Sequence, residues 1–267
     1  MEAPVGSPDD VLAIDIGATN IKFARVDALG RLRGTLKRRP TPYPCSPERL
    51  VEWITQRTRN FVIDRVGVGF PGEFEEGHVV RPGNLSRVAG VDSEIDAALD
   101  GRWQGFALEA TLRRATGRDV RVVNDATLAA LGCCRGDGVE LVMTLGTGCG
   151  LALRVQGDRR RVRDLGRTEF DAGRTFDQAL GEKARAHDTD RWRGDLVTVV
   201  NRLAEEFHAS RVYLAGGNAR RVSSELFNKR SFEVEIVGNE ASLRGAAHLF
   251  GESTPGPTPS SAPGVLG

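Results

Sequence analysis

Apolar and polar positions alternate along most of the chain, in segments of two different periods. Residues 11–27 read as an apolar strand, a glycine-containing turn and a second apolar strand. Residues 46–60 instead place apolar side chains at helical spacing, and Ser46 followed by Pro47 is a typical helix start. Strands that alternate with helices in this way predict an α/β fold built from layers.

The same patterns assign most of the remaining chain. The predicted strands lie within residues 28–37, 64–70, 121–125, 139–155 and 212–215. The predicted helices are 92–116, in two pieces separated by Gly101, then 126–132, 174–208 with breaks near 187–190 and at Gly194, and 241–250. From residue 252 onward Pro, Ser, Gly and Thr dominate, so we expect residues 252–267 to form a disordered tail.

One segment of the chain resembles another. Leu12–Val26 and Leu141–Val155 align without a gap, and both read as apolar strand, Gly/Thr turn and apolar strand. Two such hairpins half a chain apart indicate a duplicated unit that presents one glycine turn from each half. Chance similarity between two apolar hairpins is the alternative.

Composition narrows the class of protein. The chain has 267 residues, of which 40% are hydrophobic and 27% charged, and both fractions are near globular averages. This length allows one large domain or two modest ones. The formal net charge is +1, so no global field attracts nucleic acid or a membrane surface, and we expect neither as a partner.

Cysteine usage and the N-terminal segment point to the cytoplasm. The four cysteines form no C-x-x-C pair, and no histidine lies near them at ligand spacing, so neither a structural zinc site nor a disulfide framework is expected. The first ten residues lack the apolar run of a signal peptide, and no segment approaches the roughly 20 apolar residues that span a bilayer.

The first candidate for chemistry is the turn within residues 15–22. Gly17 would let backbone amides approach phosphate oxygens closely, while Thr19 and Asn20 add neutral donors. A carboxylate such as Asp15 beside phosphates makes sense with Mg²⁺, which takes carboxylate, water and phosphate oxygens. An ordinary hairpin is the alternative.

The second glycine turn spans residues 144–150. Three glycines and two threonines between apolar strands are poor packing material for a sheet, but they suit a loop around a phosphate chain. No G-K-[ST] follows, so this is not a P-loop, and the turn leads into a strand-like segment instead of the helix of a Rossmann fingerprint. A β-bulge is the alternative.

Two further motifs lie at the ends of predicted strands. Asn124 and Asp125 lie at a strand end that runs into a helix, where the ligand clefts of α/β sheets open, although Asp125 could simply cap that helix. The strand 212–215 ends in Gly216-Gly217, a flat surface against which a planar adenine could lie. A simple helix-entry turn is the alternative for this second motif.

Taken together and in order, these motifs resemble the ROK family of sugar kinases, which belongs to the hexokinase, actin and heat-shock ATPase superfamily. The resemblance runs from about residue 11 to 250 and rests on A-I-D-I-G-A-T-N-I-K, G-V-G-F-P-G, P-G-N-L, V-V-N-D-A, T-L-G-T-G-C-G and L-A-G-G-N-A. It is most similar to the polyphosphate-glucokinase-like branch.

The resemblance implies a fold and its division into lobes. The fold is the two-domain actin-like ATPase (ribonuclease H-like) α/β fold with a central cleft. Residues 1–118 would form the N-terminal lobe, completed by a C-terminal helix at 241–251, and residues 119–240 the second lobe.

The resemblance also implies an activity and the residues that carry it. The protein would transfer the terminal phosphoryl group of ATP to a hydroxyl, the 6-OH for a glucose-like sugar or cyclitol, with Asp125 as general base and Asp15 holding Mg²⁺ through water. Residues implied to clasp the phosphates or border the adenosine are Gly17, Thr19, Asn20, Lys22, Thr144, Gly146, Thr147, Gly148, Gly216, Gly217 and Asn218. Asn84 and Asn124 would bind sugar hydroxyls. Family members are commonly dimers, so the resemblance is compatible with a homodimer.

The sequence departs from the family at the sugar site and at the usual zinc cluster, which is missing. Where many members have Glu-x-Gly-His, this chain reads Asp164-Leu165-Gly166-Arg167. The shorter Asp164 and the fixed, forked cation of Arg167 put plain glucose in doubt and favour an acceptor altered at that edge. Alternatively, Arg167 only pairs with a neighbour such as Asp164 or Glu169.

The sequence also bears on three other functions and on the phosphoryl donor. A repressor of the same family would need a DNA-binding domain before the first glycine turn. Only about ten residues precede the strand that leads into that turn. A filament-forming actin-like ATPase would lack the Asn-Asp motif, and a non-catalytic sugar sensor would not need Asp125. Inorganic polyphosphate stays open as the donor in place of ATP, although no long lysine-rich groove supports it.

Overall fold

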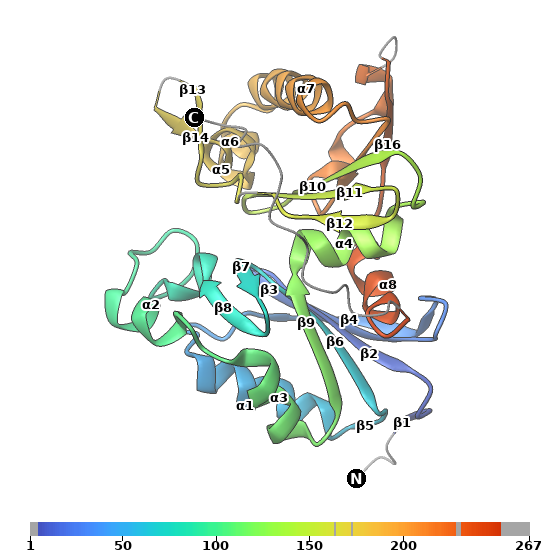
Figure 1. The fold of residues 1–267 in the computed structure, drawn as a ribbon. Helices are drawn as coiled ribbons and strands as arrows, with labels where there is room; N and C mark the ends of the chain where they lie inside the picture. The colour runs from blue at the N-terminus through green and yellow to red at the C-terminus, as the bar shows by residue number, and fades with distance from the viewer. Residues whose placement is uncertain (1–4, 163, 172, 228–230, 252–267) are drawn as a thin grey trace.

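A computed structural model describes residues 5–162, 164–171, 173–227 and 231–251 (Figure 1). Two five-stranded sheets form the two halves of the molecule, and helices α4 (Asp125–Cys133) and α8 (Ala241–His248) lie between them. The tail predicted at 252–267 lies outside the described residues. No described helix is long and apolar enough to cross a bilayer.

The first sheet has the strand order β4-β3-β2-β6-β9. Its strands are β2 (Val11–Ile16), β3 (Asn20–Val26), β4 (Leu32–Pro40), β6 (Arg65–Phe70) and β9 (Asp119–Asn124). β2 and β3 form the predicted hairpin, whereas β6 and β9 continue the sheet in parallel with β2.

The second sheet repeats this arrangement in the order β12-β11-β10-β15-β16. Its strands are β10 (Val139–Leu145), β11 (Cys149–Val155), β12 (Asp158–Arg160), β15 (Arg211–Ala215) and β16 (Glu233–Ile236). A hairpin, an antiparallel edge strand and two parallel strands occur in the same positions in both sheets. The similarity predicted between the two hairpins therefore extends to the whole sheets.

Helices cover both faces of each sheet. On the first sheet, α1 (Pro47–Thr58) and α3 (Leu108–Thr116) bury their apolar sides against Leu12, Ile14 and neighbouring residues. The second sheet is covered on the corresponding face by α7 (Thr189–Glu206), together with the short helices α5 (Phe176–Leu180) and α6 (Glu182–His187).

The helix α4 packs against both halves. Leu128 and Leu131 belong to the apolar cluster of the first sheet and α8, whereas Ala126 and Ala129 pack against the second sheet. Glycines bring α4 and α8 into backbone contact, because a Cβ on Gly132 would overlap the carbonyl oxygen of Ala241. This close packing fixes the first residue of α4 relative to both sheets.

Glycines caused two errors in the predicted helices. Gly101 does not separate helices but lies inside α2 (Ala97–Trp103), and the break comes at Gly105, whose φ of 71° is left-handed. Gly194 lies within α7. The break predicted near 187–190 is confirmed, because α6 ends at His187 and α7 begins after Asp188, whose side chain accepts a hydrogen bond from the Arg191 amide. The helix start at Ser46 is confirmed by its side chain, which accepts from the Arg49 amide.

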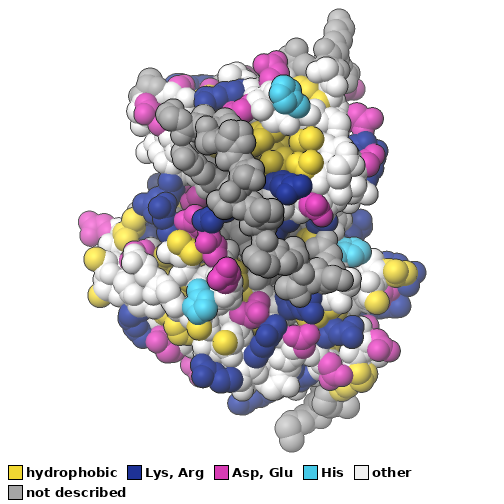
Figure 2. Space-filling model, in the orientation of Figure 1, with side chains coloured by type: hydrophobic (Ala, Val, Ile, Leu, Met, Phe, Trp, Pro, Cys, Tyr) yellow, Lys and Arg dark blue, Asp and Glu magenta, His cyan; other side chains and the backbone are white. Residues whose placement is uncertain are grey.

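The remaining elements are short. They are β1 (Val5–Gly6), β5 (Phe61–Val62), β7 (Glu73–Glu75), β8 (His78–Arg81), β13 (Glu169–Asp171), β14 (Arg174–Thr175) and the 3₁₀ turns η1 (Gly83–Ser86), η2 (Ala219–Arg221) and η3 (Ser224–Phe227). On the face seen in Figure 2, basic and acidic side chains are interspersed over both halves, consistent with the small net charge.

Candidate active site

The two glycine turns come from different sheets and touch each other. The first joins β2 to β3 and the second joins β10 to β11. The hydroxyl oxygens of Thr19 and Thr147 lie 3.2 Å apart, although 128 residues separate them in sequence. The two turns, one from each sheet, therefore lie against each other.

Hydrogen bonds to its main-chain carbonyls hold the first turn in shape. The Gly17 amide donates to the Asn20 carbonyl at 3.0 Å. From the segment that follows β4, the hydroxyl of Thr41 donates to the Gly17 carbonyl at 2.7 Å and that of Tyr43 to the Ala18 carbonyl at 2.8 Å. These bonds fix the turn without using the side chain of Thr19, which contacts Thr147, or that of Asn20.

The second turn is held from the end of β15. The Gly146 amide donates to the Gly148 carbonyl at 3.0 Å, and the Asn218 side-chain amide donates to the Gly146 carbonyl, also at 3.0 Å. Gly216 has a φ of 92°, and a Cβ there would overlap the Leu145 carbonyl, whereas Gly217 borders open space. The Gly-Gly-Asn turn therefore lies directly beside the second glycine turn.

Asp125 is the first residue of α4, and Asn124 is its N-cap. The Asn124 side-chain oxygen accepts from the amides of Ala126 and Thr127, at 2.9 and 3.2 Å, and its nitrogen donates to the Gly72 carbonyl at 2.8 Å. The capping role considered for Asp125 is thus carried mainly by Asn124. Among the described residues, the Asp125 carboxylate is hydrogen-bonded through Oδ1 alone, which accepts from the Ala126 amide at 2.8 Å.

Asp15 and Asp125 lie on either side of Gly69. A Cβ built on Gly69 would lie 3.4 Å from the Asp125 Cα and 3.6 Å from Oδ1 of Asp15. The side chain of Lys22, expected to bind phosphate, here forms an ion pair with Oδ2 of Asp15 at 3.1 Å. Two carboxylates and one ammonium group therefore gather beside the glycine turns.

The environment of Asp125 raises its pKa to about 7. Burial is the largest cause, because it disfavours the charged form, and the negative charge of Asp15 raises the pKa further. The Ala126 amide and the charge of Lys22 act in the opposite direction. A carboxyl group with a pKa near neutrality is suited to accept a proton at physiological pH.

The residues expected at the sugar lie on both halves. Asn84, in η1, accepts a hydrogen bond from Nε of Arg87 at 2.8 Å. Asp164 is exposed, and its Oδ1 accepts from the Gly166 amide at 3.1 Å. Arg167 is also exposed and forms no ion pair within the described residues, so the pairing with Asp164 or Glu169 is not found there.

Asp177 is a further candidate that the sequence motifs did not indicate. Its Oδ1 accepts from the Cys149 amide at 2.7 Å, and the carboxylate fills the space that side chains at Gly148 and Gly166 would need. Burial raises the pKa of Asp177, and the charge of Arg167 lowers it. The sequence gives only a weak signal for this residue. Thr175 and Gln178 form a capping box that opens α5, so Asp177 between them looks like an ordinary acidic residue of a first helical turn.

The carboxylates at this site fit Mg²⁺ held mainly by phosphate and water. No group of three or more His, Cys, Asp or Glu side chains suited to a metal occurs among the described residues. Mg²⁺ usually keeps several waters and binds through one or two carboxylates plus substrate phosphates. Oδ1 of Asp15 receives no hydrogen bond from any described residue, so it could serve as such a ligand.

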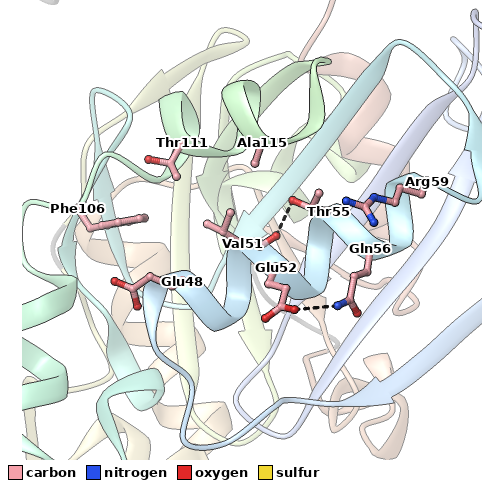
Figure 3. Close-up of a pocket in the computed structure, with 9 residues that line it drawn as sticks. All are labelled: Glu48, Val51, Glu52, Thr55, Gln56, Arg59, Phe106, Thr111 and Ala115. Atoms are coloured by element: carbon pink, nitrogen blue, oxygen red, sulfur yellow. Dashed lines mark hydrogen bonds between the residues drawn. The ribbon is translucent and has the colours of Figure 1, made fainter.

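A separate pocket lies on the other side of the first sheet. Its volume is about 420 Å³, and it lies between α1 and α3, with Val51 and Phe106 on its wall (Figure 3). None of its lining residues belongs to the predicted site, and Leu50 and Leu112 of the same helices pack on the opposite face of the sheet from Asp15. We therefore assign no part of the reaction to it.

Both the sequence and the structure are similar to known proteins. The family model of the ROK family matches residues 11–161. Comparison with curated proteins gives no match.

Solved structures with a similar fold cover most of the chain. An inorganic polyphosphate/ATP-glucomannokinase from Arthrobacter sp. strain KM is 29% identical, with a TM-score of 0.73, over 91% of this chain and 98% of that one. A ROK family glucokinase from Streptomyces griseus, in complex with glucose and AMPPNP, is 18% identical, with a TM-score of 0.67, over 90% and 98%. A ROK family transcriptional regulator, a homologue of the E. coli MLC protein, is 14% identical, with a TM-score of 0.65, over 91% and 78%.

Proposed function

Since the chain belongs to the ROK family and has its two-sheet, actin-like fold, we propose that it is a sugar kinase. The proposed reaction transfers the terminal phosphoryl group of ATP to a hydroxyl of a glucose-like sugar or cyclitol, the 6-OH for a hexose. The observation that carries the proposal is the contact between Thr19 and Thr147, which brings two glycine turns together beside Asp15 and Asp125.

Each group has a part that its position supports. Backbone amides of the two turns would hold the phosphates, because glycines allow close approach. Oδ2 of Asp125, which receives no hydrogen bond from the described part of the chain, would accept the proton of the attacking hydroxyl while Oδ1 stays bound to the Ala126 amide. Phosphoryl transfer needs positioning and charge neutralisation more than covalent help, and Mg²⁺ bound at Asp15 would supply part of that neutralisation.

The two halves are proposed to act as lobes that close on the substrates. The first sheet with the helix at 241–251 would form one lobe and the second sheet with its helices the other. Because β9 (Asp119–Asn124) belongs to the first sheet, the boundary expected at residue 118 moves to the end of β9. Besides the two threonines, ion pairs join Arg161 to Glu75 and Lys183 to Asp92 across the two halves. Closure of this kind would exclude water, which otherwise competes with the sugar as acceptor.

The acceptor is proposed to differ from plain glucose at the edge that Arg167 faces. Arg167 is exposed and forms no ion pair in the described part of the chain, so it is available to an acceptor-rich or anionic group of the sugar. A coupled ADP-release assay over hexoses, amino sugars, uronic acids and cyclitols tests this, with wild type and Arg167→His. We expect the preferred acceptor to change in the variant, and glucose as the best substrate of both proteins would refute the idea.

Polyphosphate is the second candidate donor. The 29% identical structure is named as a polyphosphate/ATP-glucomannokinase, which supports testing both donors. Initial rates with ATP and with polyphosphate at equal phosphoryl concentration would decide. Turnover with ATP alone would support the proposed donor, whereas turnover with polyphosphate alone would replace it.

A further inference from the structure

The carboxylate of Asp15 is held firmly on one of its two oxygens. The residue is buried, with 8% of its surface exposed. Oδ2 accepts a hydrogen bond from Nζ of Lys22 at 3.1 Å and a second from the hydroxyl of Ser242 at 3.0 Å. Oδ1 receives none from the described residues and lies on the side where Gly69 has no side chain. Of the two oxygens, Oδ1 is thus the one that borders the space beside Gly69, which the backbone of Asp125 also borders.

The two donors differ in how well they are fixed. Lys22 is paired with Asp15 across the β2–β3 hairpin and reaches it through a long side chain with several rotatable bonds. Ser242 has a single rotatable bond to its hydroxyl and comes from α8, 227 residues later in the chain. Its neighbours Ala241 and Leu243 are buried, so the helix position determines where the hydroxyl lies.

The position of α8 is in turn tied to Asp125. A Cβ on Gly245 would overlap the Leu128 carbonyl, and one on Gly132 would overlap the Ala241 carbonyl, so α4 and α8 pack with their backbones in contact. Asp125 is the first residue of α4. The packing of this one pair of helices therefore determines the positions of both carboxylates, that of Asp125 directly and that of Asp15 through Ser242.

We propose that Ser242 is a positioning residue for Asp15. By fixing Oδ2 together with Lys22, it keeps Oδ1 directed toward the place where the metal and the transferred phosphoryl group would sit. The terminal torsion of an aspartate is broad, so one flexible donor leaves the carboxylate free to rotate and two donors restrict it. The inference rests on the proposed function, because it needs Asp15 to act through a metal.

A purely structural role for Ser242 predicts a different result. If its hydroxyl only stabilised α8, removing it would lower the stability of the fold and leave the metal contribution to nucleotide binding unchanged. If it positions Asp15, the metal contribution falls, because partners that orient ligating carboxylates typically change metal affinity or activity by about 10–100-fold.

The test is calorimetric and requires no turnover. The dissociation constant of AMPPNP is measured with saturating Mn²⁺ and again with EDTA, and the ratio of the two constants reports the contribution of the metal. The variants are Ser242→Ala, the isosteric pair Ser242→Thr and Ser242→Val, and Asp15→Asn. Arg244→Ala, on the exposed side of the same helix, is the matched control, and thermal unfolding checks each fold.

We expect Ser242→Ala and Ser242→Val to reduce the ratio by about tenfold, while Ser242→Thr and Arg244→Ala stay within about twofold of wild type. Wild-type ratios in both Ala and Val variants, with a reduced ratio in Asp15→Asn, would overturn this inference and leave the proposed function intact. A wild-type ratio in Asp15→Asn, or no effect of the metal on the wild type, would overturn both the inference and the metal role of Asp15.

Discussion

Replacing the proposed base should make the protein more stable while removing its activity. Asp125→Asn removes the charge but keeps the size of the side chain and an oxygen that can accept from the Ala126 amide. In the folded protein the pKa of Asp125 is about 7, against an ordinary value of 3.8. Ionising this carboxyl group therefore costs free energy in the folded state that it does not cost in the unfolded chain.

The sign and size follow from linkage. Between pH 4 and pH 7 the folded state holds a proton that the unfolded state has lost, so the wild type loses stability as the pH rises through this range, and the loss is complete above about pH 7. At about 1.4 kcal/mol for each pKa unit, the full cost is about 4 kcal/mol at most, and relaxation of the site reduces it to about 2–4 kcal/mol. The neutral variant does not bear this cost.

Urea unfolding of the ligand-free protein at pH 5 and pH 8 measures the effect. We expect the advantage of Asp125→Asn to be about 1–2 kcal/mol at pH 5 and about 2–4 kcal/mol at pH 8. Asp158→Asn is the control, because its side chain is 77% exposed and its pairing with Arg160, at 3.7 Å, is at the surface, so the change should stay within about 0.5 kcal/mol. An Asp125→Asn variant that is less stable than wild type at pH 8, or an advantage independent of pH, would refute the reasoning.

Two other predictions use the same geometry. First, kcat/KM should fall as the pH drops below about 7, because Asp125 gains a proton in the free enzyme, and a pH–rate profile that is flat down to pH 5.5 would contradict its role as base. Second, Gly216→Ala should lower the free energy of unfolding by about 1–3 kcal/mol, because φ is 92° and the new Cβ would overlap the Leu145 carbonyl, whereas Gly217→Ala enters open space and should change it by less than about 1 kcal/mol. Equal losses in the two glycine variants, measured by urea unfolding, would show that the turn is not held as described.

Much of the fold could be predicted from local patterns. The hairpin at residues 11–27 alternates clearly enough to fix both strands and the turn, and its likeness to residues 139–155 is enough to indicate a repeated unit. The helix breaks predicted at Gly101 and Gly194 were wrong. Both glycines border open space on exposed sides of α2 and α7, where a glycine costs only about 1 kcal/mol of helix stability and tertiary packing outweighs that cost.

The candidate site could be predicted only where a motif marks it. Asp15, the two glycine turns and Asp125 lie in compact motifs, and the structure brings them together. Ser242 and Asp177 lie in ordinary helical sequence, and their contacts with Asp15 and with the Cys149 amide depend on how helices pack onto the sheets. Asn124 could be located, but its hydrogen bond to the Gly72 carbonyl could not be predicted, because it depends on how the segment after β6 approaches α4.

Phosphoryl transfer itself, measured with and without the proposed base, tests the central claim most directly. The best acceptor from the substrate panel is incubated with ATP labelled at the terminal phosphate, and labelled sugar phosphate is quantified for wild type and Asp125→Asn, with ATP affinity measured by calorimetry. We predict a loss of about 10²–10⁴-fold in the rate of transfer, with an ATP dissociation constant within about threefold of wild type. Equal rates of labelled product from the two proteins would contradict the account.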